Sequence, residues 1–535
     1  MTDEQPHFNL WYEPWLAVER PSGALESLNL EQTLTQAPAI HAVYDPSPLV
    51  VTSVHRLLVA VLQAIIAPQE MDDLAAVWRA GKFPAERIAA FGHRYAHRFD
   101  VFSEQAPFLQ SADLKISPEK GDKVKPVGYL LPEQPSGSAV THYKHLYDDA
   151  QIFCAACAAK GLLAIPPFAT SGGAGIKPSI NGVPPVYILP GGETLFQSLT
   201  ASLTIPKYQP EVASSDDLPW WERETPVVVG HKQEVSRVGY LHSLTFPARR
   251  VRLHPVVMNA ACSRCGKRTS WGVRTMIYEM GESRPKDASF WKDPFAAYRI
   301  NPEGKKPTPI RPIEGRALWR DFAAFFLPAP DESLSDQEKK TSVTYQRPAI
   351  LGQLDDLSEM HGVSLLPFGA AIPLRAIGMR TDMKMKIFEW EETGFSVPPR
   401  LLRDSRAGGT IRAGLNFVSD LNKRAQSIFA KRFKGNTKSQ RYRSLQRDMQ
   451  RVYWQRLGLA FRQHIAAFND NADLEVWLKG WTQAALNIAL DVFTTTVEAL
   501  PSDGNTLHQQ QDAINTFLAA AYQLRKETLP EQEAD

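Results

Sequence analysis

The cysteines of this 535-residue chain fall into two C-x-x-C pairs that are far apart in the sequence. The first pair is Cys154 with Cys157, the second is Cys262 with Cys265, and the chain has no other cysteine. In a chain without secretory features, this spacing is more typical of a tetrahedral Cys₄ metal site than of disulfides. Because the site would join two distant segments, we predict structural zinc. Metal-free thiols and a redox-active C-x-x-C are the alternatives.

No stretch of the sequence predicts secretion or a membrane partner. The first residues, 1–5, are polar and acidic and are not followed by an apolar core. The most apolar stretch, residues 48–67, contains His55 and Arg56, so it predicts a buried helix. With 43% hydrophobic and 22% charged residues, the composition is that of an ordinary globular protein. We therefore expect a cytoplasmic protein.

A glycine-rich segment is a candidate ligand loop. It runs ATSGGAGIKPSINGVPPVYIL over residues 169–189, with Gly172, Gly173 and Gly175 close together and Lys177 following. Glycines allow a backbone to approach a partner closely, and the lysine suits phosphate or a nucleic-acid groove. The segment matches neither GxxxxGK[ST] nor G-x-G-x-x-G, so a nucleotide cofactor is weakly supported. An ordinary tight turn is the alternative.

The pattern of apolar residues changes near Pro398 and Pro399, which predict a domain boundary. Residues 1–397 mix strand-like and helical segments. Residues 398–535 are almost entirely helical in pattern, with helices expected at 414–433, 440–467, 474–500 and 506–526. Short connections between long helices favour antiparallel neighbours. The predicted fold is therefore α+β, with a large mixed α/β N-terminal domain that holds the zinc site and a C-terminal antiparallel four-helix bundle.

Positive charge is concentrated at the start of this C-terminal region. Residues 400–462 contain 16 Lys and Arg against 3 Asp and Glu, a net charge of +13. Because the whole chain has a net charge of +2, the remaining residues carry about −11. A solvated helix face is the ordinary explanation of such a run. At this density we favour contact with a phosphate backbone. The residues expected to face DNA are Arg441, Arg443, Arg447 and Arg451.

A second loop candidate combines aromatic and basic side chains. Residues 135–145 read PSGSAVTHYKH. Such side chains suit unstacked bases and phosphates, although an ordinary surface loop has a similar composition. The candidate contacts for nucleic acid are Thr141, His142, Tyr143, Lys144 and His145.

Known catalytic patterns do not stand out in the sequence. We find no evident paired carboxylates, Ser/His/Asp elbow, PD-ExK, HNH or DExD/H pattern. We therefore expect a nucleic-acid-binding protein that is not an enzyme. A metal-dependent nucleic-acid-processing enzyme with a structural zinc site is the alternative.

Several motifs, taken in order, resemble the large subunit of Cascade, the type I-E CRISPR surveillance complex (CasA/Cse family). The opening FNLWYEPWLAV, residues 8–18, is similar to the family's FNLIDEPWIPV, with Tyr12 where an acid is usual. Further counterparts follow in the same order: PFLQ at 107–110, the C-x-x-C pairs, the glycine segment before PPVYIL, RRVRL at 249–253, DPFAAYR at 293–299, GRALWRD at 315–321 and the C-terminal helices.

The resemblance implies a function. The complex carries a guide RNA that pairs with the target strand, and the large subunit recognises a short adjacent motif, the PAM, in double-stranded DNA and starts strand separation. A similar division of labour between protein and guide is known for another effector. The family recognises the PAM largely from the minor groove, whose code is degenerate, so several PAMs would be tolerated. The resemblance also implies contact with other Cascade subunits and with a helicase–nuclease that acts in trans.

The resemblance also implies roles for particular residues. The glycine segment, Gly172-Gly173-Ala174-Gly175, would lie in the minor groove, and Ala174 interrupts the family's more continuous glycines. A wedge that unstacks the first target pair would fall at Thr381, Asp382, Met383 and Lys384, with Met383 where some members have glutamine. We expect a turn over 378–384, followed by a strand. The segment 135–145 would lie near the guide RNA's 5′ handle. Lys286 is the nearest candidate for a lysine that some members use at the PAM.

Overall fold

The computed structural model forms two compact units. It describes residues 5–115, 124–133, 151–170, 177–210, 216–223, 233–288, 290–301, 306–329, 344–362, 371–381, 387–433, 440–469, 471–501 and 504–529. The first unit comprises Met1–Pro312, Pro348–Phe368 and Pro373–Gly394. The second comprises Ile313–Arg347, Gly369–Ile372 and Phe395–Asp535. The C-terminal helices thus share a unit with 313–347, a segment that the predicted boundary places in the N-terminal domain.

The first unit mixes helices with small antiparallel sheets, as expected for an α+β fold. Its strands are β1 (Leu16–Glu19), β2 (Leu25–Leu28), β3 (Ala42–Val43), β4 (Val124–Pro126), β5 (Phe153–Cys154), β6 (Tyr187–Pro190), β7 (Arg249–Val257), β8 (Trp271–Met280), β9 (Tyr298–Ile300), β10 (Thr308–Pro309) and most of β12 (Ile372–Thr381) and β13 (Ile387–Val397). Its helices are α1 (Leu30–Thr35), α2 (Pro48–Ile66), α3 (Met71–Ala80), α4 (Ala85–Tyr95), α5 (Ala155–Leu163), α6 (Ile165–Phe168), α7 (Leu195–Thr200), α8 (Tyr240–Leu244) and α11 (Ala349–His361).

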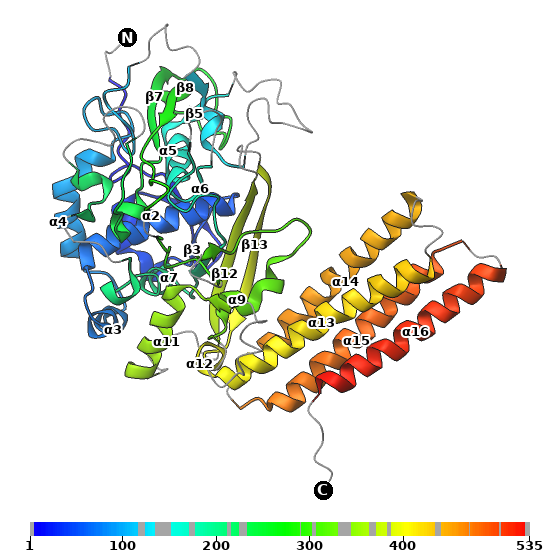
Figure 1. The fold of residues 1–535 in the computed structure, drawn as a ribbon. Helices are drawn as coiled ribbons and strands as arrows, with labels where there is room; N and C mark the ends of the chain where they lie inside the picture. The colour runs from blue at the N-terminus through cyan, green and yellow to red at the C-terminus, as the bar shows by residue number, and fades with distance from the viewer. Residues whose placement is uncertain are drawn as a thin grey trace. The chain divides into compact units, whose positions relative to one another are not determined.

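Helix α2 lies at the centre of this unit (Figure 1). It is long and apolar enough to cross a membrane by length and composition, but 89% of that window is buried inside the protein. Two of its polar side chains, His55 and Arg56, are buried and have internal partners. His55 Nε2 lies 2.8 Å from Ser202 Oγ, and Arg56 pairs with Asp293 at 2.9 Å. Helix α2 is therefore built as a core helix, as the sequence predicts.

Strand β8 organises the sheet that carries the cysteines. It pairs with β7 along one edge and with β4 and β5 along the other, in each case antiparallel. In the β5 pairing, Phe153 is opposite Val273 and Cys154 is opposite Gly272. A Cβ at Gly272 would lie 2.4 Å from Met258 Sδ, so this position needs glycine for close packing. One strand thus gathers segments from three distant parts of the sequence.

A second sheet contains the strand order β13-β12-β6. Strand β12 runs to Thr381, so the turn predicted over 378–384 is wrong for residues 378–381. Gly378 lies within the strand, where a Cβ would approach Pro312 Cγ to 2.5 Å and Val186 Cγ2 to 3.1 Å. This glycine therefore serves close packing, a common reason for glycine in a strand interior, and does not form a turn.

The second unit contains four long helices that lie side by side (Figure 1). They are α13 (Ser405–Arg432), α14 (Gln440–Ala466), α15 (Leu474–Glu498) and α16 (Gly504–Thr528), preceded by η10 (Leu318–Asp321), α9 (Phe322–Phe326), β11 (Thr344–Gln346) and α12 (Arg400–Arg403). Helix α15 packs against the other three long helices. The predicted start of the first helix at 414 is wrong, because α13 begins at Ser405. Asp404 caps it by accepting from the Arg406 and Ala407 amides.

Glycines allow large aromatic side chains to pack between these helices. A Cβ at Gly414 would lie 2.6 Å from Trp481 Cδ1, and Trp481 Nε1 donates to the Gly414 carbonyl at 3.0 Å. Gly458 of α14 accommodates Trp319 in the same way, with a Cβ only 2.7 Å from Trp319 Nε1. Trp319 also packs against Phe461, with ring centroids 5.3 Å apart. These contacts explain why the segment around Trp319 belongs with the C-terminal helices.

Candidate metal centre and nucleic-acid interface

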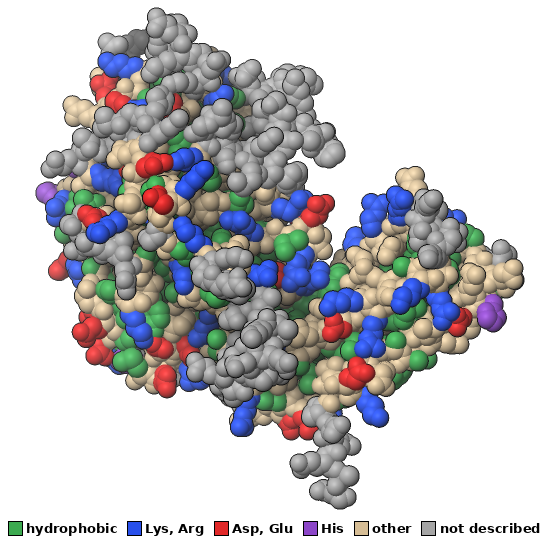
Figure 2. Space-filling model, in the orientation of Figure 1, with side chains coloured by type: hydrophobic (Ala, Val, Ile, Leu, Met, Phe, Trp, Pro, Cys, Tyr) green, Lys and Arg blue, Asp and Glu red, His purple; other side chains and the backbone are tan. Residues whose placement is uncertain are grey.

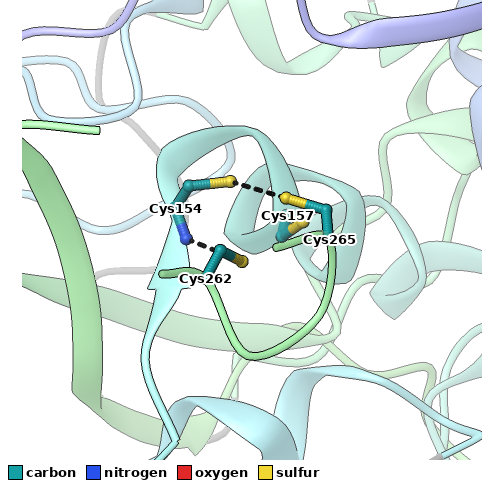
Figure 3. Close-up of side chains that lie close together, drawn as sticks. All are labelled: Cys154, Cys157, Cys262 and Cys265. Atoms are coloured by element: carbon teal, nitrogen blue, oxygen red, sulfur yellow. Dashed lines mark hydrogen bonds between the residues drawn. The ribbon is translucent and has the colours of Figure 1, made fainter. Parts of the chain in front are cut away.

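The four cysteines come together, as the sequence predicts. Their sulfur atoms all lie within 4.8 Å of one another, and Cys154 Sγ is 3.7 Å from Cys265 Sγ (Figure 3). Cys154, Cys157 and Cys262 are buried, whereas Cys265 is exposed. No disulfide joins them. Four convergent thiols match the donor set of a tetrahedral thiolate site, so this cluster could hold a metal ion.

Local structure explains this convergence. Cys154 ends β5 and caps α5, which places Cys157 in the first turn of that helix. The second pair lies in the loop between β7 and β8, where the Gly266 amide donates to the Cys262 carbonyl at 2.9 Å. Gly266 has φ +73, a conformation that L side chains rarely adopt. The Cys154 amide donates to Cys262 Sγ at 3.3 Å, so a backbone N–H group from the first cysteine segment faces a sulfur atom of the second.

Hydrogen bonds among the thiols divide them into donors and acceptors. The bond from Cys157 lowers the pKa of Cys265 to about 6. Bonds from Cys154 and Cys157 hold the pKa of Cys262 well below its usual range. Conversely, the bond with Cys154 is the largest of several effects that raise the pKa of Cys157. The hydrogen bonds thus favour the thiolate at Cys262 and Cys265 and the thiol at Cys157.

A buried ion-pair network holds the second cysteine pair against the start of α2. Arg264, between the two cysteines, donates to Asp45 Oδ1 at 2.6 Å and to Oδ2 at 3.1 Å. Lys160 of α5 reaches the same carboxylate at 3.0 Å. Although burial raises the pKa of Asp45, Arg264 and Lys160 hold it below its usual value. The network ties both cysteine segments to one carboxylate, independently of any metal.

The glycine segment itself, Gly172, Gly173, Ala174 and Gly175, lies outside the described residues, but its two ends are described. Arg249 of β7 is buried, and its guanidinium donates to the carbonyls of Thr170 and Lys177. Its Nε also donates to Tyr278 Oη at 3.1 Å. The sequence does not predict Arg249 as a functional residue. Its place in the RRVRL motif is the only sequence signal that could have indicated it.

The predicted ligand Lys177 is paired. Its Nζ lies 2.5 Å from Glu234 Oε1, and both side chains are partly exposed. An exposed pair of this kind contributes little stability, so the lysine remains available to a stronger anion. Lys286, the candidate for a PAM lysine, is described, and its carbonyl accepts a hydrogen bond from Lys306 Nζ at 3.2 Å.

Most of the predicted wedge and RNA-contact residues cannot be placed. Thr381 ends β12 and is half-buried. The other predicted wedge residues, Asp382, Met383 and Lys384, lie outside the described residues. The same holds for the five candidate RNA or subunit contacts, Thr141, His142, Tyr143, Lys144 and His145.

The four arginines predicted to face DNA are exposed along α14. Arg443, Arg447 and Arg451 follow one another at intervals of four, so they form one stripe, whereas Arg441 lies off that stripe. Arg451 lies 3.5 Å from Asp448. Figure 2 shows Lys and Arg gathered at one end of α14.

The local charge of +13 overstates the free positive charge of this region. Carboxylates of α15 and α16 neutralise part of the basic run, because Arg424 pairs with Glu527, Arg432 with Asp512 and Arg456 with Asp491. These acids lie outside residues 400–462, so a count along that segment omits them. The stripe on α14 is therefore a more specific candidate interface than the whole basic run.

Comparisons with known proteins give one consistent result. Residues 9–492 match the family model described as CRISPR-associated protein Cse1. A CRISPR-associated protein CasA/Cse1 from Thermus thermophilus is 30% identical over 504 residues, which cover 90% of this chain and 91% of the relative. The solved structure of Thermobifida fusca Cse1 has a TM-score of 0.79 at 22% identity, covering 99% of this chain and 100% of that one. A chain of a CRISPR RNA-guided surveillance complex has a TM-score of 0.70 at 19% identity, covering 97% and 100%.

Proposed function

Because the chain belongs to the CRISPR-associated Cse1 (CasA) family, the large subunits of the type I-E Cascade surveillance complex, we propose that it recognises the PAM in double-stranded DNA and starts target unwinding. The observation that carries this proposal is the family match, which spans residues 9–492. In this role the protein works within a complex that holds a guide RNA and other Cascade subunits in the cytoplasm. It presents the opened duplex to a helicase–nuclease acting in trans and does not itself cut.

The glycine segment is proposed to enter the minor groove. Arg249 supports this assignment, because it holds the carbonyls on both sides of residues 171–176. A loop tied at both ends loses less conformational entropy when it meets DNA, which favours binding. Lys177, at one of these ends, would exchange Glu234 for a phosphate.

Two further elements complete the proposal. Residues Thr381 to Lys384 would wedge beneath the PAM, at a cost of a few kcal/mol for unstacking a base step, which contacts to phosphates offset. Thr381 ends β12, and the other three residues precede β13 in the sequence; these two long strands pair in one sheet and would give a wedge a firm base. Residues 141–145 would contact the guide RNA's 5′ handle or a neighbouring subunit, and the α14 stripe would contact DNA.

The cysteine cluster is proposed to bind structural zinc through Cys154, Cys157, Cys262 and Cys265. The donor set fits, because the sulfur atoms of four thiols lie within 4.8 Å of one another. Zinc bound there would hold β5 and α5 against the β7–β8 loop. Four thiol ligands complete the tetrahedral coordination that is typical of a structural zinc site.

The proposal is tested by target binding of the reconstituted complex on duplexes that differ only in the PAM. We expect Gly173→Asp and Gly175→Asp to weaken binding to the PAM duplex by at least about a hundredfold, because each places a carboxylate against DNA. Gly480→Asp is the control, because Gly480 is exposed on α15 and a Cβ there meets nothing within 4 Å.

Two results would contradict the proposal. Undiminished binding by both loop variants would indicate a scaffold that does not touch the PAM. Strand cleavage by the isolated protein with Mg²⁺ or Mn²⁺, abolished by a single carboxylate substitution, would indicate the alternative, a nucleic-acid-processing enzyme.

A further inference from the structure

The second unit contains an open cavity of about 410 Å³ that none of the roles above uses. It lies where η10, α9 and β11 meet α13 and α14. A cavity of this size is in the range that holds small organic ligands. The residues that line it are Arg316, Trp319, Arg320, Asp321, Ala323, Ala324, Tyr345, Arg412, Leu415, Asn416, Val418, Ser419 and Trp454.

The ionisable side chains of the lining carry a net positive charge. The lining contains three arginines and a single carboxylate, that of Asp321. The Arg316 guanidinium donates hydrogen bonds of 2.6 to 3.2 Å to the oxygens of this carboxylate. Arg412 donates to the backbone carbonyl of Pro328. Arg320 lies over the ring of Trp454, with Cζ 3.6 Å from the ring centroid, and makes no described side-chain hydrogen bond. Neither Arg320 nor Arg412 forms an ion pair among the described residues, although the charge of Asp321 also acts on Arg320.

The electrostatic surroundings agree with this charge imbalance. Burial, and then the charge of Arg316, lower the pKa of Arg320 to about 10. Burial also lowers the pKa of Arg412. Partly desolvated guanidinium groups that do not form an ion pair gain from an anion with several oxygen acceptors, and phosphate matches the planar guanidinium fork particularly well.

The remaining lining suits an organic group beside that anion. Tyr345 provides half-buried aromatic surface, beside the buried rings of Trp319 and Trp454, and Asn416 and Ser419 provide polar atoms. Trp454 is buried and holds Arg320 by a cation–π contact, which fixes the guanidinium without using its N–H donors. Aromatic surface next to arginine is the combination that proteins use for a base and its phosphate.

We propose that this cavity binds a nucleotide phosphate, with Arg320 and Arg412 as the phosphate ligands and the aromatic side chains beside the nucleoside. The phosphate could belong to a free nucleotide or to one unit of a nucleic-acid strand. The site shares no residue with the glycine segment or the wedge, so this inference does not depend on the proposed PAM recognition.

The test measures binding to the purified full-length chain by isothermal titration calorimetry. The probes are AMP, adenosine, inorganic phosphate and a short single-stranded oligothymidylate. We expect AMP to bind at least about tenfold more tightly than adenosine, and Arg320→Gln to remove most of this difference. Arg320→Lys should keep part of it, because the charge remains but the fork is lost. Arg462→Gln is the matched control, since Arg462 is exposed on the same helix as Trp454 and does not line the cavity.

Each outcome decides the proposal. If AMP binds and the oligonucleotide displaces it at a lower concentration, the phosphate that occupies the cavity belongs to a nucleic-acid strand. If AMP binds more tightly than the oligonucleotide, the phosphate belongs to a free nucleotide. Three results would overturn the proposal: equal binding of AMP and adenosine, no measurable binding of any phosphate probe, or equal effects of Arg320→Gln and Arg462→Gln on AMP binding. Circular dichroism and thermal unfolding of Arg320→Gln establish that lost binding is not lost folding.

Discussion

Arg249 donates a hydrogen bond of 2.8 Å from Nη1 to the carbonyl oxygen of Lys177, the first described residue after the glycine segment. The same guanidinium donates to Thr170, the last described residue before it. One buried side chain therefore fixes both ends of a segment whose sequence is mostly glycine. This link connects the β7–β8 sheet to the loop proposed to meet DNA.

Replacing Arg249 tests whether this link matters for target recognition. Arg249→Lys keeps the charge but cannot span two carbonyls, so we expect a loss of about 1–3 kcal/mol in the free energy of unfolding. We also expect the complex to distinguish PAM from non-PAM duplexes less well, as measured by equilibrium binding. Arg252→Lys is the control, because Arg252 lies on the same strand and donates to the carbonyl of Ser103 at 3.0 Å. If both variants reduce PAM discrimination equally, Arg249 has no special role at the loop.

The wedge assignment separates two kinetic steps. Met383→Ala and Lys384→Ala should slow strand opening by about tenfold while changing initial duplex association little, since the wedge acts after docking. Stopped-flow fluorescence of a 2-aminopurine placed at the first target position reports opening, and anisotropy of the same duplex reports association. An equal decrease in both steps would show that these residues contribute to docking and do not form a wedge.

Metal removal should destabilise the first unit. With free zinc at about a thousand times its dissociation constant, bound metal would contribute about 4 kcal/mol, which Cys262→Ser should remove. We expect about one zinc per wild-type chain by elemental analysis. Ser263→Ala is the matched control, because Ser263 Oγ accepts from the Ile152 amide at 3.0 Å but is not a thiol. Wild-type protein that contains no metal and is unaffected by a chelator would contradict the zinc assignment.

The arginine stripe on α14 should determine the salt dependence of DNA binding. For duplex DNA, each phosphate that a protein neutralises steepens the plot of log K against log salt by about 0.9. The triple variant Arg443→Gln, Arg447→Gln and Arg451→Gln should therefore flatten the slope by about 2 to 3. Arg456→Gln removes a charge from the same helix but from a different face, where Arg456 meets Asp491 of α15, so it should leave the slope nearly unchanged. Similar slopes for both variants would show that the stripe does not contact DNA.

Acid should destabilise the first unit through His55. Burial, followed by the charges of Arg375 and Arg56, lowers the pKa of this imidazole to about 3. The unfolded chain binds a proton near pH 6.5 and the folded chain does not, so the stability contributed by neutral His55 is complete above that pH. It falls by up to about 1.4 kcal/mol per pH unit between about pH 6.5 and 3.

Urea unfolding from about pH 4.5 to 7.5 measures this dependence. His55→Gln keeps a hydrogen-bond donor for Ser202. It should reduce the slope of unfolding free energy against pH by the amount that corresponds to about one bound proton. The exposed His93 supplies the control, His93→Gln, which should leave the slope unchanged. An unchanged slope in His55→Gln would show that other groups cause the acid sensitivity.

Sequence reasoning succeeds where a pattern depends on neighbours along the chain. The bounds predicted for the helices that form α14 and α15 agree with the structure to within two residues, because their ends carry turn residues. The C-x-x-C spacing correctly groups four thiols. The predicted start of α13 is too late because Gly408 and Gly409 have low helix propensity, which packing and the Asp404 cap override.

It fails where a residue's role depends on a partner far along the chain. The turn predicted at Gly378 is wrong because the sequence does not show that Pro312 lies against this glycine. The charge count overestimates the basic run because Asp491, Asp512 and Glu527 reach it only after the helices assemble. Arg249 stands out in the sequence only as part of a motif, since its two carbonyl partners become neighbours only in the folded sheet.

The position of β8 has a consequence for how the protein is made. This strand is the shared partner of β4, β5 and β7, yet it is translated last of the four. On the ribosome, Cys154 and Cys157 emerge long before the loop that carries Cys262 and Cys265, and long before β8 can hold the segments together. Contacts between such distant segments form slowly. A metal ion held by all four thiols, as proposed, could therefore bind only after the second pair has been synthesised, which would make metal loading a late event in biogenesis.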